Sequence, residues 1–158
     1  MHKDTMAAQA ASNQFLSFKL GGLEYGLDFG KVQELRILKS LERFAADGAI
    51  VEGVAVSRGV IMPIVDMRAA FSGHPVATRP TTDVIILKLS TCVMGMVVDG
   101  VTDVVTLLPD QISPIPGADG GAIDYLIGLG VTDGRRLILV DIDRLMSIDK
   151  RGSARQVA

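Results

Sequence analysis

The chain has 158 residues, enough for one ordinary domain or two very small ones. Hydrophobic residues make up 48% of it and charged residues 22%, so the chain can bury a core and is not disordered as a whole. The net charge of −2 argues against nucleic acid as the main partner, because phosphate binding needs clustered Lys and Arg. A single cysteine, no apolar leader and no run of about 18–20 apolar residues together predict a cytoplasmic protein that does not insert into a membrane.

The chain is expected to begin with a mobile tail over residues 1–13, followed at once by strands. Apolar and polar residues alternate over Leu16–Leu20, as in a strand with one buried face. Gly21 and Gly22 predict a tight hairpin turn into a second strand, Leu23–Leu27. The next strand, Val32–Leu38, places Glu34 and Arg36 on one face and Leu35 and Ile37 on the other.

Two apolar strands, Val54–Val56 and Val60–Val65, flank a short turn whose one charged residue is Arg58. Pro63 removes a backbone donor from the second strand, so it is expected at an edge or irregularity of its sheet. Asp66 follows where a helix N-cap belongs, and the segment "DMRAAF" predicts one helical turn.

The second half repeats this order of elements. Val84–Leu89 and Val93–Val98 flank a three-residue turn, and Leu137–Val140 is another continuously apolar strand. Asp141 is expected to cap a short C-terminal helix, and residues 150–158 to form a second mobile tail.

Two ungapped alignments indicate that the chain contains an internal repeat. Phe15–Leu38 aligns with Val84–Leu107, and Gly53–Met67 aligns with Gly128–Ile142. Two matches in the same order favour a duplication over chance. The identical pairs are Lys19/Lys88, Leu20/Leu89, Gly26/Gly95, Val32/Val101, Leu38/Leu107, Gly53/Gly128, Val56/Val131, Gly59/Gly134, Val65/Val140 and Asp66/Asp141.

Each copy contains about five short strands, which favours a small barrel over an open sheet. A unit of about 60 residues is marginally stable alone, so we expect the two barrels to pack together. The sequence therefore predicts an all-β protein, with a first barrel over residues 14–80 and a second over residues 81–149 that includes the C-terminal helix.

A search for catalytic, cofactor-binding or metal-binding patterns in the sequence finds none, so we expect a non-enzymatic protein without cofactors or metal. His2 falls in the tail and His74 in a polar connector, while Cys92 falls at a hairpin tip with no basic neighbour. Gly128 and Gly130 lack the third glycine and long helix of a phosphate-binding loop. Such a protein is expected to work by contact, through grooves and edges that partners occupy. The remaining candidates, Asp99, Asp103, Asp110 and Asp119, lack the spacing of a calcium-binding loop.

The order of these segments resembles the CheW family of chemotaxis coupling proteins. The matching text is "FKLGGLEYGLDFGKVQELR", "VEGVAVSRGVIMPIVDMR", "MGMVVDGVTDVV" and "YLIGLGVTDGRRLILVDIDRLMS", and it covers Phe15 to Ser147. The resemblance implies two five-stranded SH3-like barrels packed together as one CheW-like domain. It also implies an adaptor that couples the cytoplasmic tips of chemoreceptors to the regulatory domain of the histidine kinase CheA, at membrane-associated receptor arrays.

The resemblance also implies which residues face the partners. By residue-to-residue match, the receptor-binding residues are Val32, Glu34, Arg58, Gly59 and Gly95. An arginine at a turn offers five donors in a fixed geometry to carboxylates or helix-end carbonyls of a receptor. The kinase-binding residues are expected to be Leu41, Glu42, Ile50 and Glu52.

One departure from the family pattern leaves alternatives open. The family usually has Asn-Leu-Arg-Gly at the central turn, and this chain has Val56 and Ser57 before Arg58 and Gly59. The altered turn is compatible with a CheW-like scaffold of another chemosensory-type pathway, such as pilus motility or development. A small-barrel nucleic-acid binder is a third hypothesis, against which the missing basic patches and aromatic platforms argue.

Overall fold

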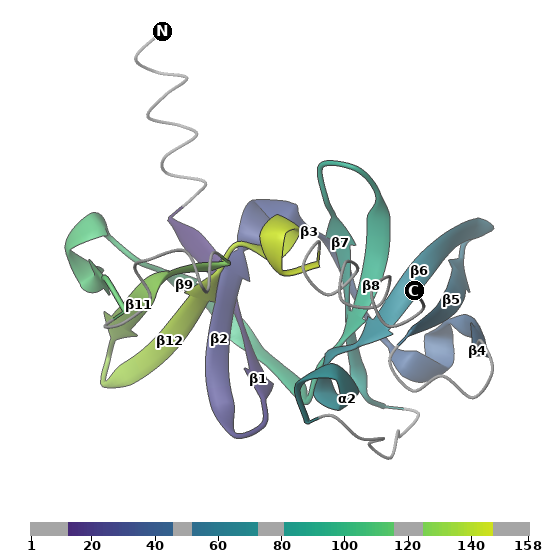
Figure 1. The fold of residues 1–158 in the computed structure, drawn as a ribbon, viewed down its shortest axis with the longest axis horizontal. Helices are drawn as coiled ribbons and strands as arrows, with labels where there is room; N and C mark the ends of the chain where they lie inside the picture. The colour runs from purple at the N-terminus through teal and green to yellow at the C-terminus, as the bar shows by residue number, and fades with distance from the viewer. Residues whose placement is uncertain (1–12, 46–51, 73–80, 116–124, 147–158) are drawn as a thin grey trace, which may run out of the picture. The chain divides into compact units, whose positions relative to one another are not determined.

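The computed structural model describes residues 13–45, 52–72, 81–115 and 125–146, and these form twelve β-strands with short helical segments between them (Figure 1). None of the helices in these ranges is long and apolar enough to cross a membrane. The helical segments are η1 (Phe29–Lys31), η2 (Leu38–Ser40), α2 (Met67–Ser72), η3 (Pro109–Gln111) and residues 142–146. The strands are β1 (Gln14–Leu20), β2 (Leu23–Asp28), β3 (Val32–Ile37), β4 (Glu42–Ala45), β5 (Glu52–Ser57), β6 (Val60–Asp66), β7 (Asp83–Lys88), β8 (Val93–Val97), β9 (Gly100–Thr106), β10 (Ile112–Ser113), β11 (Leu126–Thr132) and β12 (Arg135–Val140).

The strands form two sheets. The first has the order β10-β11-β12-β2-β1-β9, and the second has the order β3-β7-β8-β6-β5-β4. Each sheet contains one parallel pair, which is β12 with β2 in the first sheet and β6 with β8 in the second. The other pairs whose register is described are antiparallel. The mainly-β class, the division into two sheets and the short helices are confirmed, and each sheet has six strands where the sequence predicted five per barrel.

The internal repeat is visible in the order of the strands. The repeat makes β1 and β2 equivalent to β7 and β8, and makes β5 and β6 equivalent to β11 and β12; β4 and β10 occupy matching positions in the two sheets. Both sheets then have the same order of equivalent strands, and Gly26 pairs with Leu139 in one as Gly95 pairs with Ile64 in the other. The first hairpin of the N-terminal half, β1–β2, therefore belongs to the sheet that contains β10, β11 and β12. The first hairpin of the C-terminal half, β7–β8, belongs to the sheet that contains β4, β5 and β6.

This exchange divides the chain differently from the consecutive halves 14–80 and 81–149. One compact unit comprises the described residues within 1–17, 24–30 and 104–158, and the other comprises those within 18–23 and 31–103. The difference arises because β2 and β8 pair in parallel with strands of the opposite half, and a parallel pair needs a long crossover connection.

Three tight hairpin turns have positive φ at both central residues, as type I′ turns require. Gly21 and Gly22 form the predicted turn between β1 and β2. The other two turns are equivalent in the repeat and use a non-glycine residue first. They are Arg58 (φ 54°) with Gly59 (φ 78°), and Asp133 (φ 50°) with Gly134 (φ 75°).

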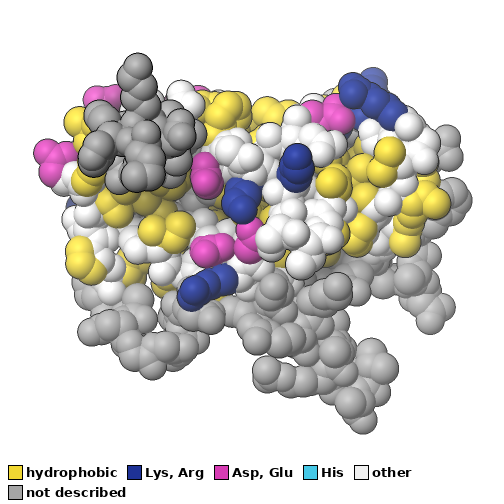
Figure 2. Space-filling view, turned by 90° about the horizontal axis from the view of Figure 1, so that it is seen from above, with side chains coloured by type: hydrophobic (Ala, Val, Ile, Leu, Met, Phe, Trp, Pro, Cys, Tyr) yellow, Lys and Arg dark blue, Asp and Glu magenta, His cyan; other side chains and the backbone are white. Residues whose placement is uncertain are grey.

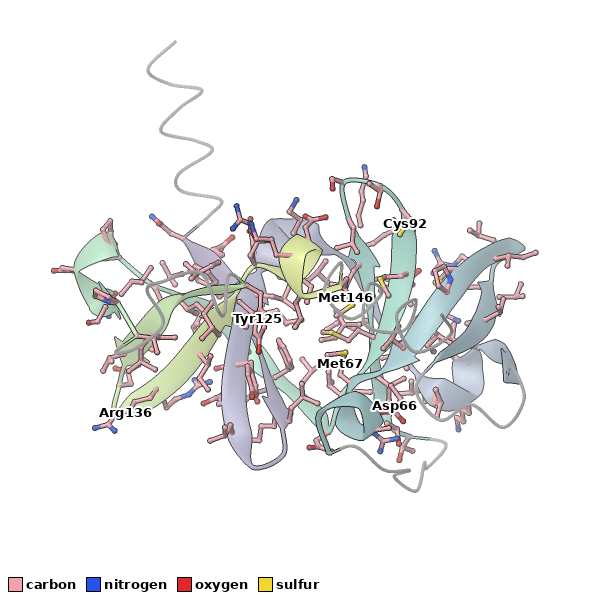
Figure 3. The ribbon with its side chains drawn as sticks, viewed as in Figure 1. Asp66, Met67, Cys92, Tyr125, Arg136 and Met146 are labelled. Carbon is pink, nitrogen blue, oxygen red and sulfur yellow. The ribbon has the colours of Figure 1, made fainter. Side chains whose placement is uncertain are left out.

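The two predicted helix caps are confirmed. The Asp66 carboxylate accepts a hydrogen bond from the backbone N–H of Arg68 (3.1 Å) and another from Arg68 Nη2 (2.8 Å), at the start of α2 (Figure 3). The hydrogen bond with Asp66 raises the pKa of the buried Arg68 guanidinium, which keeps it charged. Asp141 Oδ1 accepts from the backbone N–H of Arg144 (3.2 Å) and begins the helical residues 142–146.

Pro63 lies where its sheet tolerates a missing donor. It pairs with Val54 of β5, and the pairing of β6 with β8 begins only at Ile64. At Pro63 itself the strand therefore has a neighbour on one side, and its side chain is exposed, as the sequence predicted for an irregular position.

Apolar side chains fill the interior of each unit. Within the second sheet and its connections the buried cluster consists of Leu38, Leu41, Ala55, Met62, Ile64, Val84, Ile86 and Val97. In the other unit it consists of Phe15, Val105, Leu107, Leu137 and Leu139.

Candidate partner-binding site

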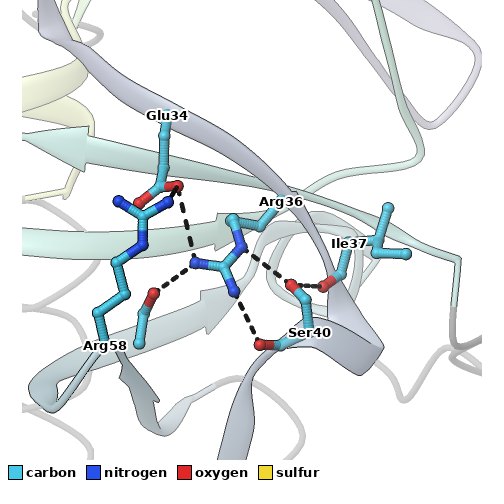
Figure 4. Close-up of polar contacts among 6 residues, drawn as sticks. Glu34, Arg36, Ile37, Ser40 and Arg58 are labelled. Atoms are coloured by element: carbon cyan, nitrogen blue, oxygen red, sulfur yellow. Dashed lines mark hydrogen bonds and ion pairs between the residues drawn. The ribbon is translucent and has the colours of Figure 1, made fainter.

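Glu34 and Arg58, two of the predicted receptor-binding residues, lie together in the second sheet. Glu34 is on β3, and Arg58 is on the turn between β5 and β6. Arg58 Nη2 lies 3.3 Å from Glu34 Oε2, while 77% of the Arg58 side chain and 23% of the Glu34 side chain remain exposed (Figure 4). The sequence placed both residues on one partner-facing surface, and the structure brings them into contact.

Backbone pairing does not by itself bring these two residues together. In the strand order β3-β7-β8-β6-β5-β4, three strands separate β3 from β5. The contact requires the sheet to curve until β3 approaches the end of β5, as the strands of an SH3-like barrel do. Side chains across this closure therefore determine how Glu34 and Arg58 are aligned.

Arg36 makes one hydrogen bond across the closure and two to the helical turn that follows β3 (Figure 4). Its Nη1 donates to Ser57 Oγ at the end of β5 (2.5 Å), its Nε donates to Ser40 Oγ (3.0 Å), and its Nη2 donates to the Ser40 carbonyl oxygen (2.9 Å). The same Nη1 lies 3.6 Å from Glu34 Oε2. Arg36 thus links β3, η2 and β5, and only 19% of its side chain is exposed.

The site carries more positive than negative charge. Two guanidinium groups approach one carboxylate oxygen of Glu34, which leaves one positive charge without a matching carboxylate in the cluster. In the parts of the chain that the structure describes, Glu34 is the single polar partner of the Arg58 side chain. The other guanidinium donors of Arg58 are therefore available to a carboxylate or a carbonyl oxygen of a partner.

The turn positions Arg58 by an unusual backbone conformation. Its φ of 54° lies in the left-handed region, which costs a residue with a side chain roughly 1–2 kcal/mol. The next residue, Gly59, has a φ of 78°, and a Cβ added there would meet no atom within 4 Å. The backbone dihedral, and not a close approach of other atoms, is therefore the reason for a glycine at this position.

Replacing Gly59 tests this explanation. Gly59→Ala is expected to lower the free energy of unfolding by about 1 kcal/mol, because a Cβ is strained at positive φ even where space is open. Urea denaturation measures the change, with Lys19→Ala at an exposed strand position as the control. A Gly59→Ala variant as stable as the natural chain would contradict it.

The other two predicted receptor-binding residues are less accessible. Val32 is half-buried and pairs with Leu87 beside a bulge in β3. Gly95 is buried, and a Cβ there would lie 3.4 Å from Ile64 Cγ1 and from Val84 Cγ1. Packing thus limits the size of a side chain at Gly95, and we expect any effect of this position on a partner to act through the core.

The predicted kinase-binding residues are described only in part. Leu41 is 6% exposed and belongs to the core of the second sheet, so it supports the fold from inside. Glu42 and Glu52 lie on the neighbouring strands β4 and β5. Ile50 lies outside the described residues.

An exposed apolar patch on the β5–β6 hairpin was not predicted. Val60 is 54% and Ile61 is 73% exposed directly after Gly59, and Val54 of β5 is 38% exposed. In the space-filling view, hydrophobic side chains gather on the right, the side of Figure 1 on which β5 and β6 lie (Figure 2). The sequence shows only a continuous apolar strand here, and such a strand does not reveal which of its faces is left uncovered.

The other unit contains a comparable serine–arginine contact. Ser17 of β1 is completely buried, and its hydroxyl accepts a hydrogen bond from Arg135 Nη2 (3.1 Å). The Arg135 guanidinium also pairs with the Glu24 carboxylate. Alternation in β1 did not predict a buried serine, because its partners come from β2 and β12.

Candidate metal-binding groups do not gather in the described residues. Within residues 13–45, 52–72, 81–115 and 125–146, no three His, Cys, Asp or Glu side chains are grouped so that they could hold a metal ion. Cys92 is exposed near the β7–β8 turn (Figure 3). His2 and His74 lie outside the described residues.

Comparison with known proteins identifies the family. Residues 14–150 match the family model described as a CheW-like domain. The chain is 42% identical over 154 residues to the chemotaxis protein CheW of Klebsiella aerogenes, covering 97% of this chain and 93% of that protein. It is 28% identical over 156 residues to the chemotaxis protein CheW of Rhizobium meliloti, covering 95% and 99%.

A solved structure agrees with the fold. The scaffolding protein TtCheW from Thermoanaerobacter tengcongensis superimposes with a TM-score of 0.69 at 23% identity, covering 82% of this chain and 89% of that one. The two-sheet architecture and the matches along nearly the whole sequence lead to one assignment: the chain belongs to the CheW-like family of chemotaxis scaffold proteins.

Proposed function

We propose that this CheW-family scaffold couples chemoreceptors to the histidine kinase CheA without catalysing a reaction, and that the surface around Glu34 and Arg58 binds the receptor. Arg58 carries the proposal, because its side chain is 77% exposed on a tight turn just before the exposed apolar residues Val60 and Ile61. The protein is expected to act in the cytoplasm, recruited to membrane-associated receptor arrays.

The chemistry of the surface suits a helical partner. A receptor tip is a helical hairpin, and a helix binds to a surface through a row of apolar side chains with a few charged contacts. Val54 and Ile61, which are exposed on the same face of the β5–β6 hairpin, offer the apolar contact. Arg58 offers several donors to a carboxylate or to the carbonyl groups at a helix end.

A separate surface is required for the kinase, because an adaptor must hold both partners at once. We propose that the regulatory domain of CheA binds at the edge strand β4, which carries Glu42, and at the Glu52 end of β5, the opposite end of that strand from Arg58. The order of strands makes β4 the edge of the second sheet, and a sheet edge is a common place for a partner to bind.

Titrations of the full chain test the proposal. The purified protein is titrated with a receptor cytoplasmic fragment and, separately, with the regulatory domain of CheA. Saturable 1:1 binding to each, and a ternary complex when both are present, are expected. Failure to bind the receptor fragment, or competition between the two partners for one site, would refute the proposed arrangement.

Salt should weaken receptor binding only modestly. The excess charge of the site is a single positive charge, and much of the contact is apolar, so raising the salt from about 0.05 M to 0.5 M is expected to reduce the affinity roughly two- to fivefold. The Arg58→Ala variant should lose most of this dependence. A slope that is unchanged in Arg58→Ala would assign the charged contact to another residue.

A further inference from the structure

Ser57 occupies a buried position directly before Arg58. It is 6% exposed, and its Oγ accepts a hydrogen bond from Arg36 Nη1 at 2.5 Å. The family pattern that the sequence resembles usually has leucine at this position, and a leucine side chain has no atom that could accept this hydrogen bond. The contact between Ser57 and Arg36 is therefore a feature of this chain.

The position of Arg36 Nη1 decides which arginine pairs with Glu34. Nη1 lies 2.5 Å from Ser57 Oγ and 3.6 Å from Glu34 Oε2, whereas Arg58 Nη2 lies 3.3 Å from the same Oε2. The serine hydroxyl thus satisfies Nη1 and keeps it from closing on the carboxylate. Without the hydroxyl, Nη1 would be free to close on Glu34 Oε2 and to compete with Arg58 for this oxygen.

We propose that Arg36 is a positioning residue of the partner-binding surface, and that the Ser57 hydroxyl sets its position so that Glu34 holds Arg58. This inference rests on the proposed function of the Glu34–Arg58 surface. Neither Arg36 nor Ser57 needs to touch the receptor, because the Arg36 side chain is only 19% exposed and Ser57 is only 6% exposed. They determine affinity by aligning the exposed guanidinium before the partner arrives, which lowers the cost of ordering it on binding.

The position of Ser57 also lets it act on the surface from behind. Its hydroxyl links β5 to β3 across strands that are not neighbours in the sheet, so it acts where backbone hydrogen bonds do not. A change at this position can alter receptor affinity while every residue of the exposed surface stays the same.

Ser57→Ala tests the proposal in the full chain. The variant should bind the receptor fragment about three- to tenfold more weakly, within the range of coupling between residues of one network. Its affinity for the regulatory domain of CheA should change by less than about twofold. Ser57→Thr, which keeps a hydroxyl and suits a strand, should restore most of the receptor affinity.

Two further variants separate positioning from general stability. Ser17→Ala removes a buried hydroxyl that also accepts from an arginine, in the other unit, so it should lower the thermal stability comparably and leave receptor affinity unchanged. In an Arg58→Ala background, Ser57→Ala should have no further effect on receptor binding, because the residue that it positions is absent. The proposal would be overturned if Ser57→Ala left the receptor affinity unchanged. It would also be overturned if Ser57→Ala weakened receptor binding by the same factor in the Arg58→Ala background as in the natural chain.

A measurement on the free protein distinguishes failure of this inference from failure of the proposed function. NMR relaxation of the arginine Nε–H groups should show a more mobile Arg58 side chain in Ser57→Ala than in the natural chain. If the natural chain does not bind the receptor fragment, the proposed function fails. If Arg58 is equally ordered in both proteins, the positioning role fails whatever the binding result.

Discussion

Arg58→Ala is expected to weaken binding of the receptor fragment by about 1–3 kcal/mol, the usual range for losing a hydrogen bond to a charged group. The free energy of unfolding should change by less than about 1 kcal/mol, because the pair with Glu34 is exposed on the arginine side and surface ion pairs contribute little. Isothermal titration and thermal melts measure the two quantities. A loss of several kcal/mol of stability would instead make Arg58 a structural residue.

The backbone of the turn provides a sharper control for Arg58. Asparagine tolerates positive φ better than most residues and is favoured in type I′ turns. Arg58→Asn should therefore be at least as stable as Arg58→Ala while losing the same receptor affinity. Arg58→Lys should recover only part of the affinity if the partner is bound by both arms of the guanidinium, since an ammonium group lacks this planar geometry. Full recovery by lysine would reduce the contact to simple charge attraction.

Gly95→Asp is expected to lower the free energy of unfolding by at least about 3 kcal/mol, and so to abolish the binding of both partners. Gly95 is buried on β8, and its Cβ position lies against Ile64 and Val84, so the added carboxylate would be placed in an apolar core. Far-UV circular dichroism with urea denaturation measures the loss of fold. A folded Gly95→Asp variant that loses receptor binding alone would make Gly95 a direct contact residue.

The alanine variant separates volume from charge at the same position. Gly95→Ala adds one methyl group at ordinary contact distance from Ile64 and Val84, so it should cost no more than about 1 kcal/mol. Both partners should still bind the alanine variant. An alanine variant as unstable as Gly95→Asp would show that the strand cannot accept any side chain there.

Local elements were predictable because their signals lie in neighbouring residues. Alternation and paired glycines located β1, β2 and their turn, and Asp66 and Asp141 located the starts of two helical segments. The order of equivalent strands in the two sheets also follows the repeat that the sequence shows. The exchange of hairpins between the halves was not predictable, because the parallel pairing of β6 with β8 and of β12 with β2 is a choice between similar apolar strands.

The candidate site was predictable only in its exposed members. The match to the family pattern selected Glu34 and Arg58, and the structure places them 3.3 Å apart. Gly95, which the same match selected, and Leu41, which was expected to bind the kinase, are both buried. Residue identity at a family position thus does not distinguish a contact with a partner from a contact that supports the surface from behind.

The sequence by itself determined the all-β class, the duplication, the turns and the family, because each depends on the spacing of residues along the chain. The tertiary structure alone decided that Arg36 and Ser57 belong to the site, since β3 and the end of β5 meet only when the sheet curves. It also decided that Ser17 is buried and that Ile61 is exposed. Burial depends on which strands of the other half come to lie beside a residue, and that information is distributed over the whole chain rather than held in any one segment.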